Sequence, residues 1–230
     1  MLDFKKVLLF IGIFLVIFAV LNLVVPFSGL DKWYDQQFVK VGEKVYGNYK
    51  DKAQVEFKLW DNNKSVAFKM PFKNYDKVIR TSILSKAYIE RASKLALAQG
   101  ATSVTLDHAQ FFTDNWLYVW LPLLLFWALV LASPVPILRK IIAFLLGTLI
   151  INAFIYFKFW VRFKVEFSRH NGWIKLGELE GISKPIFLNL NTFLLYMGSS
   201  LIFSIIVWAL LTFRQKDQYM FMKQPAAVEE

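Results

Sequence analysis

The amino-acid sequence predicts an all-α membrane bundle of four transmembrane helices. It also predicts a small extracytoplasmic α/β domain between the first and second helices, and a hairpin loop between the third and fourth. Four long apolar runs without a formal charge support the bundle, because a helix of about 20 apolar residues can cross a bilayer. The runs are Val7–Val25, Trp116–Ala132, Ile141–Phe157 and Phe193–Phe213.

The domain boundaries follow from these runs. Residues 1–25 form an N-terminal signal-anchor helix, since the run is longer than a cleaved signal peptide needs and no small-residue cleavage site follows it. Residues 26–115 form the extracytoplasmic α/β domain. Residues 116–213 form a three-helix transmembrane region with an extracytoplasmic loop at 162–191, and residues 214–230 form a cytoplasmic tail.

The positive charges near the ends of the runs predict the orientation, since basic residues are retained in the cytoplasm. Lys5 and Lys6 precede the first run, Arg139 and Lys140 lie in the connection between the second and third, and Arg214 follows the fourth. Together they place both termini in the cytoplasm, and we expect a bacterial inner-membrane protein. Basic residues after the third run, beginning at Arg162, favour the opposite orientation.

The domain is predicted to begin with an amphipathic helix that is capped at Ser28 and ends near Gly47. Its apolar positions are expected on one side and its charged residues, including Asp31 and Asp35, on the other. Trp33 and Tyr34 are interfacial candidates that could anchor the helix in the lipid headgroup layer. The alternative is that the apolar side packs on the domain.

The rest of the domain is predicted as a hairpin, a helix and a third strand. Residues 55–59 and 66–70 alternate between apolar and polar side chains, with turn residues between them. Residues 76–99 have helical spacing that ends at Gly100, and residues 101–108 could form the third strand.

The loop after the third run has a strand-like pattern. Val161, Phe163, Val165 and Phe167 alternate with polar residues, and the pair Asn171-Gly172 is a strong hairpin turn. We therefore expect a second hairpin docked on the first external domain. The alternative continues the third helix outward through Phe163.

The apolar runs themselves contain no ionisable residue, which disfavours an ion-coupled transporter or a channel. We predict that their polar and small residues serve helix packing. Lys158 lies just beyond the third run, where a long side chain can reach the membrane interface. The helix-packing residues are Asn152, Gly198, Ser199 and Ser200.

No catalytic, cofactor-binding or metal-binding residue is predicted. The chain has no cysteine, which excludes disulfides, iron–sulfur clusters and cysteine nucleophiles. Its two histidines, His108 and His170, do not support a histidine-rich metal site. A cluster of Ser103, Asp107, His108 and Asp114 is the best enzyme candidate, but it matches no nucleophile motif.

The segment Trp116–Phe159 loosely resembles the membrane portion of exosortase-type proteins. The similarity lies in an apolar span, a short proline-containing basic turn with Arg139, and a second span with Asn152. The nucleophilic cysteine of that family has no counterpart here, so the resemblance assigns no functional residue.

The sequence thus favours a non-catalytic integral membrane subunit or assembly factor of a larger cell-envelope complex. A membrane-embedded enzyme or lipid-handling protein is the alternative, and a transporter component is a weaker one. The expected partners are membrane lipids and proteins of the complex. Nucleic acid is not an expected partner, although the net charge is +10.

Overall fold

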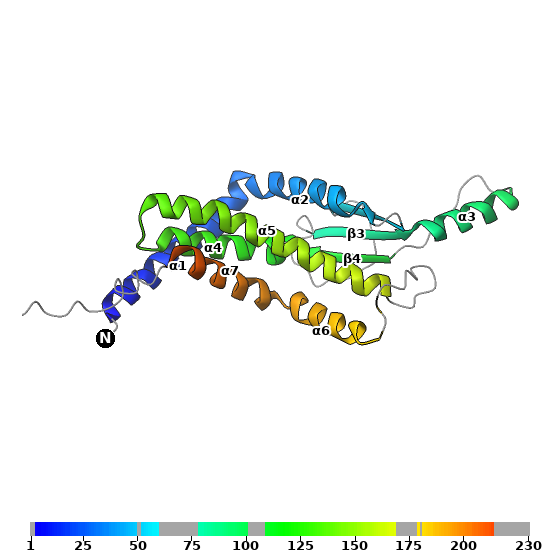
Figure 1. Cartoon of the computed structure of the whole chain (residues 1–230). Helices are drawn as coiled ribbons and strands as arrows, with labels where there is room; N and C mark the ends of the chain where they lie inside the picture. Colours follow the sequence, from blue (N-terminus) through cyan, green and yellow to red (C-terminus); the bar gives the residue numbers. More distant parts are fainter. Residues whose placement is uncertain are drawn as a thin grey trace, which may run out of the picture. The chain divides into compact units, whose positions relative to one another are not determined.

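The computed structural model describes residues 3–49, 52–59, 78–100, 109–168, 179 and 181–213 (Figure 1). This part of the protein is mostly helical and contains a small antiparallel sheet. The chain divides into two compact units. The first unit contains residues 1–30, 119–155 and 197–230, and the second contains residues 31–118 and 156–196.

The first unit is built from apolar helices. They are α1 (Phe4–Ser28), α4 (Leu121–Ala132) with the end of the preceding π-helix η2 (Trp116–Trp120), the first part of α5 (Ile137–Ser168), and α7 (Met197–Thr212). Within the described residues, α1 and α5 are each long and apolar enough to cross a membrane. The helix α6 (Ser183–Leu195) and α7 would add a third crossing if they form one broken span. These helices indicate an integral membrane protein.

Close packing and indole hydrogen bonds hold the first unit together. The indole of Trp127 on α4 donates to the Thr148 hydroxyl on α5 over 2.9 Å. The indole of Trp208 on α7 donates to the Ser133 hydroxyl at the end of α4 over 2.8 Å. The Phe154 ring stacks on Phe203 with centroids 4.0 Å apart, which joins α5 to α7. These contacts give buried polar groups partners that lipid could not supply.

Basic side chains in the first turn of α5 bond the carboxyl ends of two helices. The Lys140 ammonium donates to the Leu131 carbonyl over 2.7 Å, and the Arg139 guanidinium donates to the Thr212 carbonyl over 3.3 Å. A positive charge is favourable at a helix carboxyl end because the backbone carbonyls there lack partners.

The second unit contains a four-stranded antiparallel sheet in the order β1-β2-β3-β4. The strands are β1 (Asn48–Tyr49), β2 (Ala53–Leu59), β3 (Val78–Ser85) and β4 (Ala109–Asp114). Val55 pairs with Ile83, and Thr81 pairs with Phe111, so the register places Val55, Ile83, Thr81 and Phe111 on one face. The predicted strand at 55–59 is confirmed.

Two helices pack on this face of the sheet through aromatic rings. The helix α2 (Leu30–Tyr46) contributes Tyr46, and the second part of α5 contributes Phe163. The Phe163 ring lies 4.9 Å from the Tyr46 ring, 6.1 Å from Phe57 of β2 and 5.8 Å from Phe111 of β4. The core of the second unit is therefore an aromatic cluster between the sheet, α2 and α5.

The expected second hairpin is wrong at its first strand, because residues 161–167 are helical and belong to α5. The alternative, a helix continuing through Phe163, is confirmed. Val161, Phe163, Val165 and Phe167 are all buried, since this part of α5 is covered on more than one side. A helix buried on two sides imitates the alternation of a strand. The expected turn Asn171-Gly172 lies outside the described residues.

Two further expectations need correction. Within the predicted helix at 76–99, the described residues Val78–Ser85 form the strand β3, and only α3 (Lys86–Ala98) is helical, as a direct continuation of β3 (Figure 1). The expected fourth span is also not one straight helix, since Tyr196 has an extended backbone with ψ 125° between α6 and α7. The expected strands at 66–70 and 101–108 lie outside the described residues.

Candidate functional site

A group of buried polar side chains distinguishes the second unit. Asp31 and Asp35 lie on the buried side of α2 and are each only 3% exposed. They share that side with Phe38, Gly42 and Tyr46, which follow at helical spacing. A carboxylate removed from water needs a hydrogen-bond partner or an opposite charge. These aspartates and the groups around them are therefore the candidate functional site.

Asn115 provides the partner of Asp35. It follows β4 directly, is fully buried, and donates a hydrogen bond from its side-chain amide to the Asp35 carboxylate. This bond fixes the amide orientation, because the reverse orientation would set its oxygen against the carboxylate. The helix α2 is thereby joined to the end of the sheet.

Three buried oxygens of the second unit have no hydrogen-bond partner among the described residues. They are the Thr81 and Thr113 hydroxyls and the Asn115 amide oxygen, and all three are buried. Thr81 and Thr113 lie on the sheet face that packs against α2 and α5, as the strand register shows. Groups of this kind are usually satisfied by ordered water inside the protein.

A second polar group surrounds Tyr118 in the π-helix η2. The Tyr118 hydroxyl donates to the Leu195 carbonyl at the end of α6 over 2.7 Å. The Lys158 ammonium lies 4.5 Å from the centre of the Tyr118 ring, and the Arg162 guanidinium lies 3.8 Å from the centre of the Phe111 ring. Cations over aromatic faces are stabilised by the ring quadrupole. π-helices are rare and are often found at functional sites.

Tyrosines also bond α2 to α5 in the second unit. The Tyr46 hydroxyl donates to the Tyr156 carbonyl over 2.7 Å, and the Tyr156 hydroxyl donates to the Phe38 carbonyl over 3.2 Å. Burial raises the pKa of Tyr46 to about 12, because the phenolate would lose its hydration. Tyr46 therefore stays a neutral hydrogen-bond donor.

The chemistry of this arrangement is that of internal bracing. Asp35, Asn115 and Lys158 each have less than a tenth of their surface exposed, so a substrate could not reach them without opening the unit. Within the described ranges, no group of three or more potential metal ligands of the histidine, cysteine, aspartate or glutamate type occurs. The polar groups hold α2, α5, α6 and the end of the sheet in one arrangement.

The residues of the predicted enzyme cluster are mostly outside the described part of the chain. Ser103, Asp107 and His108 all belong to residues that the structure does not describe. Asp114 is described, and its carboxylate accepts a hydrogen bond from the Leu117 backbone amide over 3.2 Å, at the start of the π-helix. Asp114 therefore caps a helical turn.

The predicted helix-packing residues all lie in the first unit. The Asn152 side chain donates to the Thr148 carbonyl of its own helix over 2.8 Å. Ser199 and Ser200 are buried in α7, and the Ser200 carbonyl accepts a hydrogen bond from Ser204 over 2.9 Å. Gly198 lies in the same helix. Their assignment to helix packing stays a prediction.

The interfacial candidates differ in exposure. Trp33 is 57% exposed on α2, and Tyr34 beside it is half-buried. Lys158 is 6% exposed and lies inside the second unit over the Tyr118 ring. The location of these residues relative to a membrane stays a prediction.

Sequence reasoning missed the buried aspartates, because it assigned Asp31 and Asp35 to the water-facing side of α2. A usable signal was present. Asp31 and Asp35 align with Phe38, Gly42 and Tyr46, and Gly42 is the small residue that permits close approach. A side-chain carbon built at Gly42 would lie 3.3 Å from the Phe57 ring, so this side of the helix touches the sheet.

Comparisons with known proteins do not identify a family. No protein-family model, curated protein or solved structure matches this chain. The resemblance of Trp116–Phe159 to exosortase-type proteins therefore stays an expectation.

Proposed function

We propose that this protein is a non-catalytic integral membrane subunit or assembly factor of a larger cell-envelope complex. The observation that carries the proposal is the internal use of its polar groups. Asp35 is bonded to Asn115, Tyr118 to Leu195 and Tyr46 to Tyr156, and these groups brace the second unit from within. The large side chains that α1 exposes along its apolar length are hydrocarbon.

The proposed topology has four spans and both termini in the cytoplasm of a bacterial inner membrane. The helix pair η2 and α4 covers 116–132, roughly 25 Å at 1.5 Å per residue, which is close to the hydrocarbon thickness. Arg139 and Lys140 at the start of α5 supply the positive charge expected on the cytoplasmic side. Arg139 bonds the Thr212 carbonyl at the end of α7, and Lys140 bonds the Leu131 carbonyl near the end of α4. These bonds support the proposal that the carboxyl ends of α4 and α7 lie at the same depth in the membrane.

Single cysteines test this topology, since the native chain has none. An impermeant maleimide added to intact cells should label Asn62→Cys and leave Gln224→Cys unlabelled. Labelling of Gln224→Cys alone would reverse the orientation, and labelling of both would refute a four-span arrangement.

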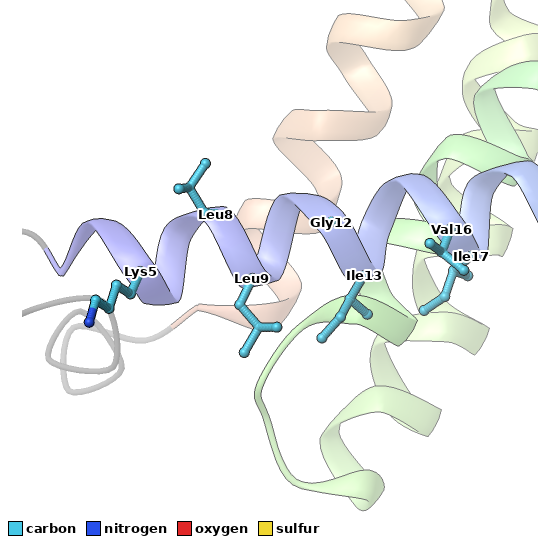
Figure 2. A pocket seen from close by; sticks show the side chains of 7 residues that line it. All are labelled: Lys5, Leu8, Leu9, Gly12, Ile13, Val16 and Ile17. Atoms are coloured by element: carbon cyan, nitrogen blue, oxygen red, sulfur yellow. The ribbon is translucent and has the colours of Figure 1, made fainter.

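We propose that the partner contacts this protein through a helix that packs on the exposed side of α1. An open apolar groove runs along this helix, and Figure 2 shows its lining side chains, all of which belong to α1. Gly12 lies in the groove, and a side-chain carbon built there would meet nothing within 4 Å. Glycine in a membrane helix allows another helix to approach closely. The occupant we propose is a transmembrane helix of a larger subunit.

A pull-down from a gentle detergent tests the function directly. The wild-type protein should co-purify with larger membrane subunits, and Gly12→Leu should lose them while accumulating normally, because the groove has room for the leucine. Ile11→Phe is the matched control, since Ile11 is 43% exposed outside the groove. Purification of the wild-type protein alone would overturn the proposal. If the Gly12→Leu variant retains all subunits, the contact does not involve this side of α1.

The enzyme alternative depends on Asp107 and His108. An Asp107→Ala, His108→Ala double variant should keep function in a complementation assay if it accumulates in the membrane. Normal accumulation with complete loss of function would favour the enzyme.

A further inference from the structure

The helix α2 has three distinct sides, and its polarity is inverted relative to an ordinary surface helix. One side is buried and contains both aspartates with Phe38, Gly42 and Tyr46. A second side is apolar and exposed. A third is charged and exposed, with Lys32, Lys40 and Glu43. An ordinary surface helix turns its apolar stripe inward and its acids outward.

The buried side fixes the rotation of α2 about its own axis. Asp35 is bonded to Asn115, Tyr46 donates to the Tyr156 carbonyl, and the Phe38 carbonyl accepts the Tyr156 hydroxyl. Gly42 faces the Phe57 ring at contact distance. These four contacts are spread over the length of the helix. The helix cannot rotate to bury its apolar side without breaking them.

The apolar side, which we name the outer stripe, consists of Leu30, Trp33, Val41 and Val45. These four side chains are 41%, 57%, 43% and 56% exposed. Leu30 and Trp33 are neighbours at helical spacing, as are Val41 and Val45, and the half-buried Gln37 lies between the two pairs. Exposed apolar side chains gathered on one side of a helix mark a surface that contacts a membrane or another protein.

Charge on α2 decides between these two partners. Because Asp31 and Asp35 are both buried, the charged residues that α2 exposes are Lys32, Lys40, Lys44 and Glu43, which is an excess of positive charge. An exposed tryptophan in the stripe and lysines beside it are the features of a helix that lies in a lipid headgroup layer. A single residue, Gly29, separates α2 from the end of the apolar helix α1, so α2 begins directly after a candidate membrane span.

We propose that α2 lies in the headgroup layer of a leaflet that contains anionic phospholipid. The outer stripe enters the boundary with the acyl chains, and Lys32, Lys40 and Lys44 contact lipid phosphates. The buried aspartates make this possible, because the same carboxylates on the exposed sides would repel the phosphates. The partner is thus a lipid surface rather than a protein subunit.

Spin labels in proteoliposomes test the proposal with the full-length protein. A label at Val41→Cys, in the outer stripe, should be protected from a polar nickel quencher and accessible to oxygen. A label at Glu43→Cys, on the charged side, should show the opposite preference. Val45→Cys is a second stripe position, in case the first substitution disturbs folding. The vesicles contain phosphatidylcholine with or without phosphatidylglycerol.

The lipid class is tested with lysine substitutions in the same vesicles. Each lysine near an anionic surface favours membrane contact by about fivefold. The triple variant Lys32→Gln, Lys40→Gln, Lys44→Gln should therefore lose the extra protection of the Val41→Cys label that phosphatidylglycerol provides. Equal nickel access at Val41→Cys and Glu43→Cys in every vesicle would overturn the proposal. Protection of the Val41→Cys label only in the presence of a co-purified protein would also overturn it. The same holds if the protection is unchanged by phosphatidylglycerol and by the three lysine substitutions.

Discussion

The contact between Gly147 and Phe126 gives a quantitative test of packing in the first unit. A side-chain carbon built at Gly147 on α5 would lie 2.0 Å from the tip of the Phe126 ring on α4, and 2.6 and 2.7 Å from two further ring carbons. Real carbon contacts of this kind do not fall below 3.0 Å. Phe126 is fully buried, so its ring can move only by displacing its neighbours.

Two opposing effects determine the outcome of Gly147→Ala. Alanine is favoured over glycine in a helix by about 1 kcal/mol. Overpacking a filled site costs about 1–3 kcal/mol, and a contact this short belongs at the upper end of that range. We therefore expect a net loss of about 1–2 kcal/mol in the free energy of unfolding, measured by denaturation with SDS in mixed micelles.

The variant Phe126→Leu completes a double-mutant cycle. It removes the ring that causes the clash, so Gly147→Ala should cost less in the Phe126→Leu background than in the wild type. We expect a coupling energy of about 1–2 kcal/mol, well above the roughly 0.5 kcal/mol that independent sites show. Additive effects, or a stabilised Gly147→Ala, would refute the packing argument.

Three other predictions concern the second unit and use the same unfolding measurement. Phe163→Ala should lower the free energy of unfolding by about 3–5 kcal/mol, because the ring is fully buried among aromatic neighbours. The control Phe157→Ala, at a 42% exposed position, should lower it by less than about 1 kcal/mol. Equal losses for the two variants would contradict the aromatic core. Asp35→Ala should cost about 1–3 kcal/mol because it leaves the buried Asn115 amide without its acceptor, and an unchanged stability would show that the bond contributes nothing. Because the pKa of Tyr46 is raised to about 12, wild-type stability should fall as the pH rises above the unfolded value of 10.0 and through 12. Tyr46→Phe should fall less steeply there, and identical profiles would exclude Tyr46 as the cause.

Apolar length was the reliable signal in the sequence. It located α1 and α5 because a long run without charge has few alternatives to a membrane helix, whatever its neighbours. The extra length of α5 was not predictable from its apolar run, since Lys158, Arg162 and Lys164 interrupt it. Lys158 and Arg162 lie over the rings of Tyr118 and Phe111 from other parts of the second unit, which the local sequence does not reveal.

Burial on more than one side explains the main errors. β3 is buried at most of its positions on both faces, so its apolar residues do not alternate, and the stretch Ile83-Leu84 joined the helical pattern of α3. The same effect gave α5 the alternation of a strand at 161–167. Periodicity distinguishes helix from strand only when one side faces water.

The candidate site was the least predictable part. Assigning Asp31 and Asp35 to water follows the usual behaviour of carboxylates. Asp35 is instead bonded to Asn115, which lies far along the chain. A pairing between distant residues leaves no local pattern. The sequence left open whether the apolar side of α2 faces the domain or the headgroup layer, because periodicity alone does not show what covers a helix face.

The aromatic core of the second unit also sets the order in which the chain can fold. Phe57 and Phe111 are synthesised before α4, whereas their partners Phe159 and Phe163 are synthesised near the end of α5. Until the ribosome has produced α5, the sheet lacks part of its cover and exposes aromatic rings, which is the state most prone to aggregation. Completion of this sheet during synthesis therefore waits for a later membrane helix, and any chain that terminates before residue 156 is left with an unfinished fold.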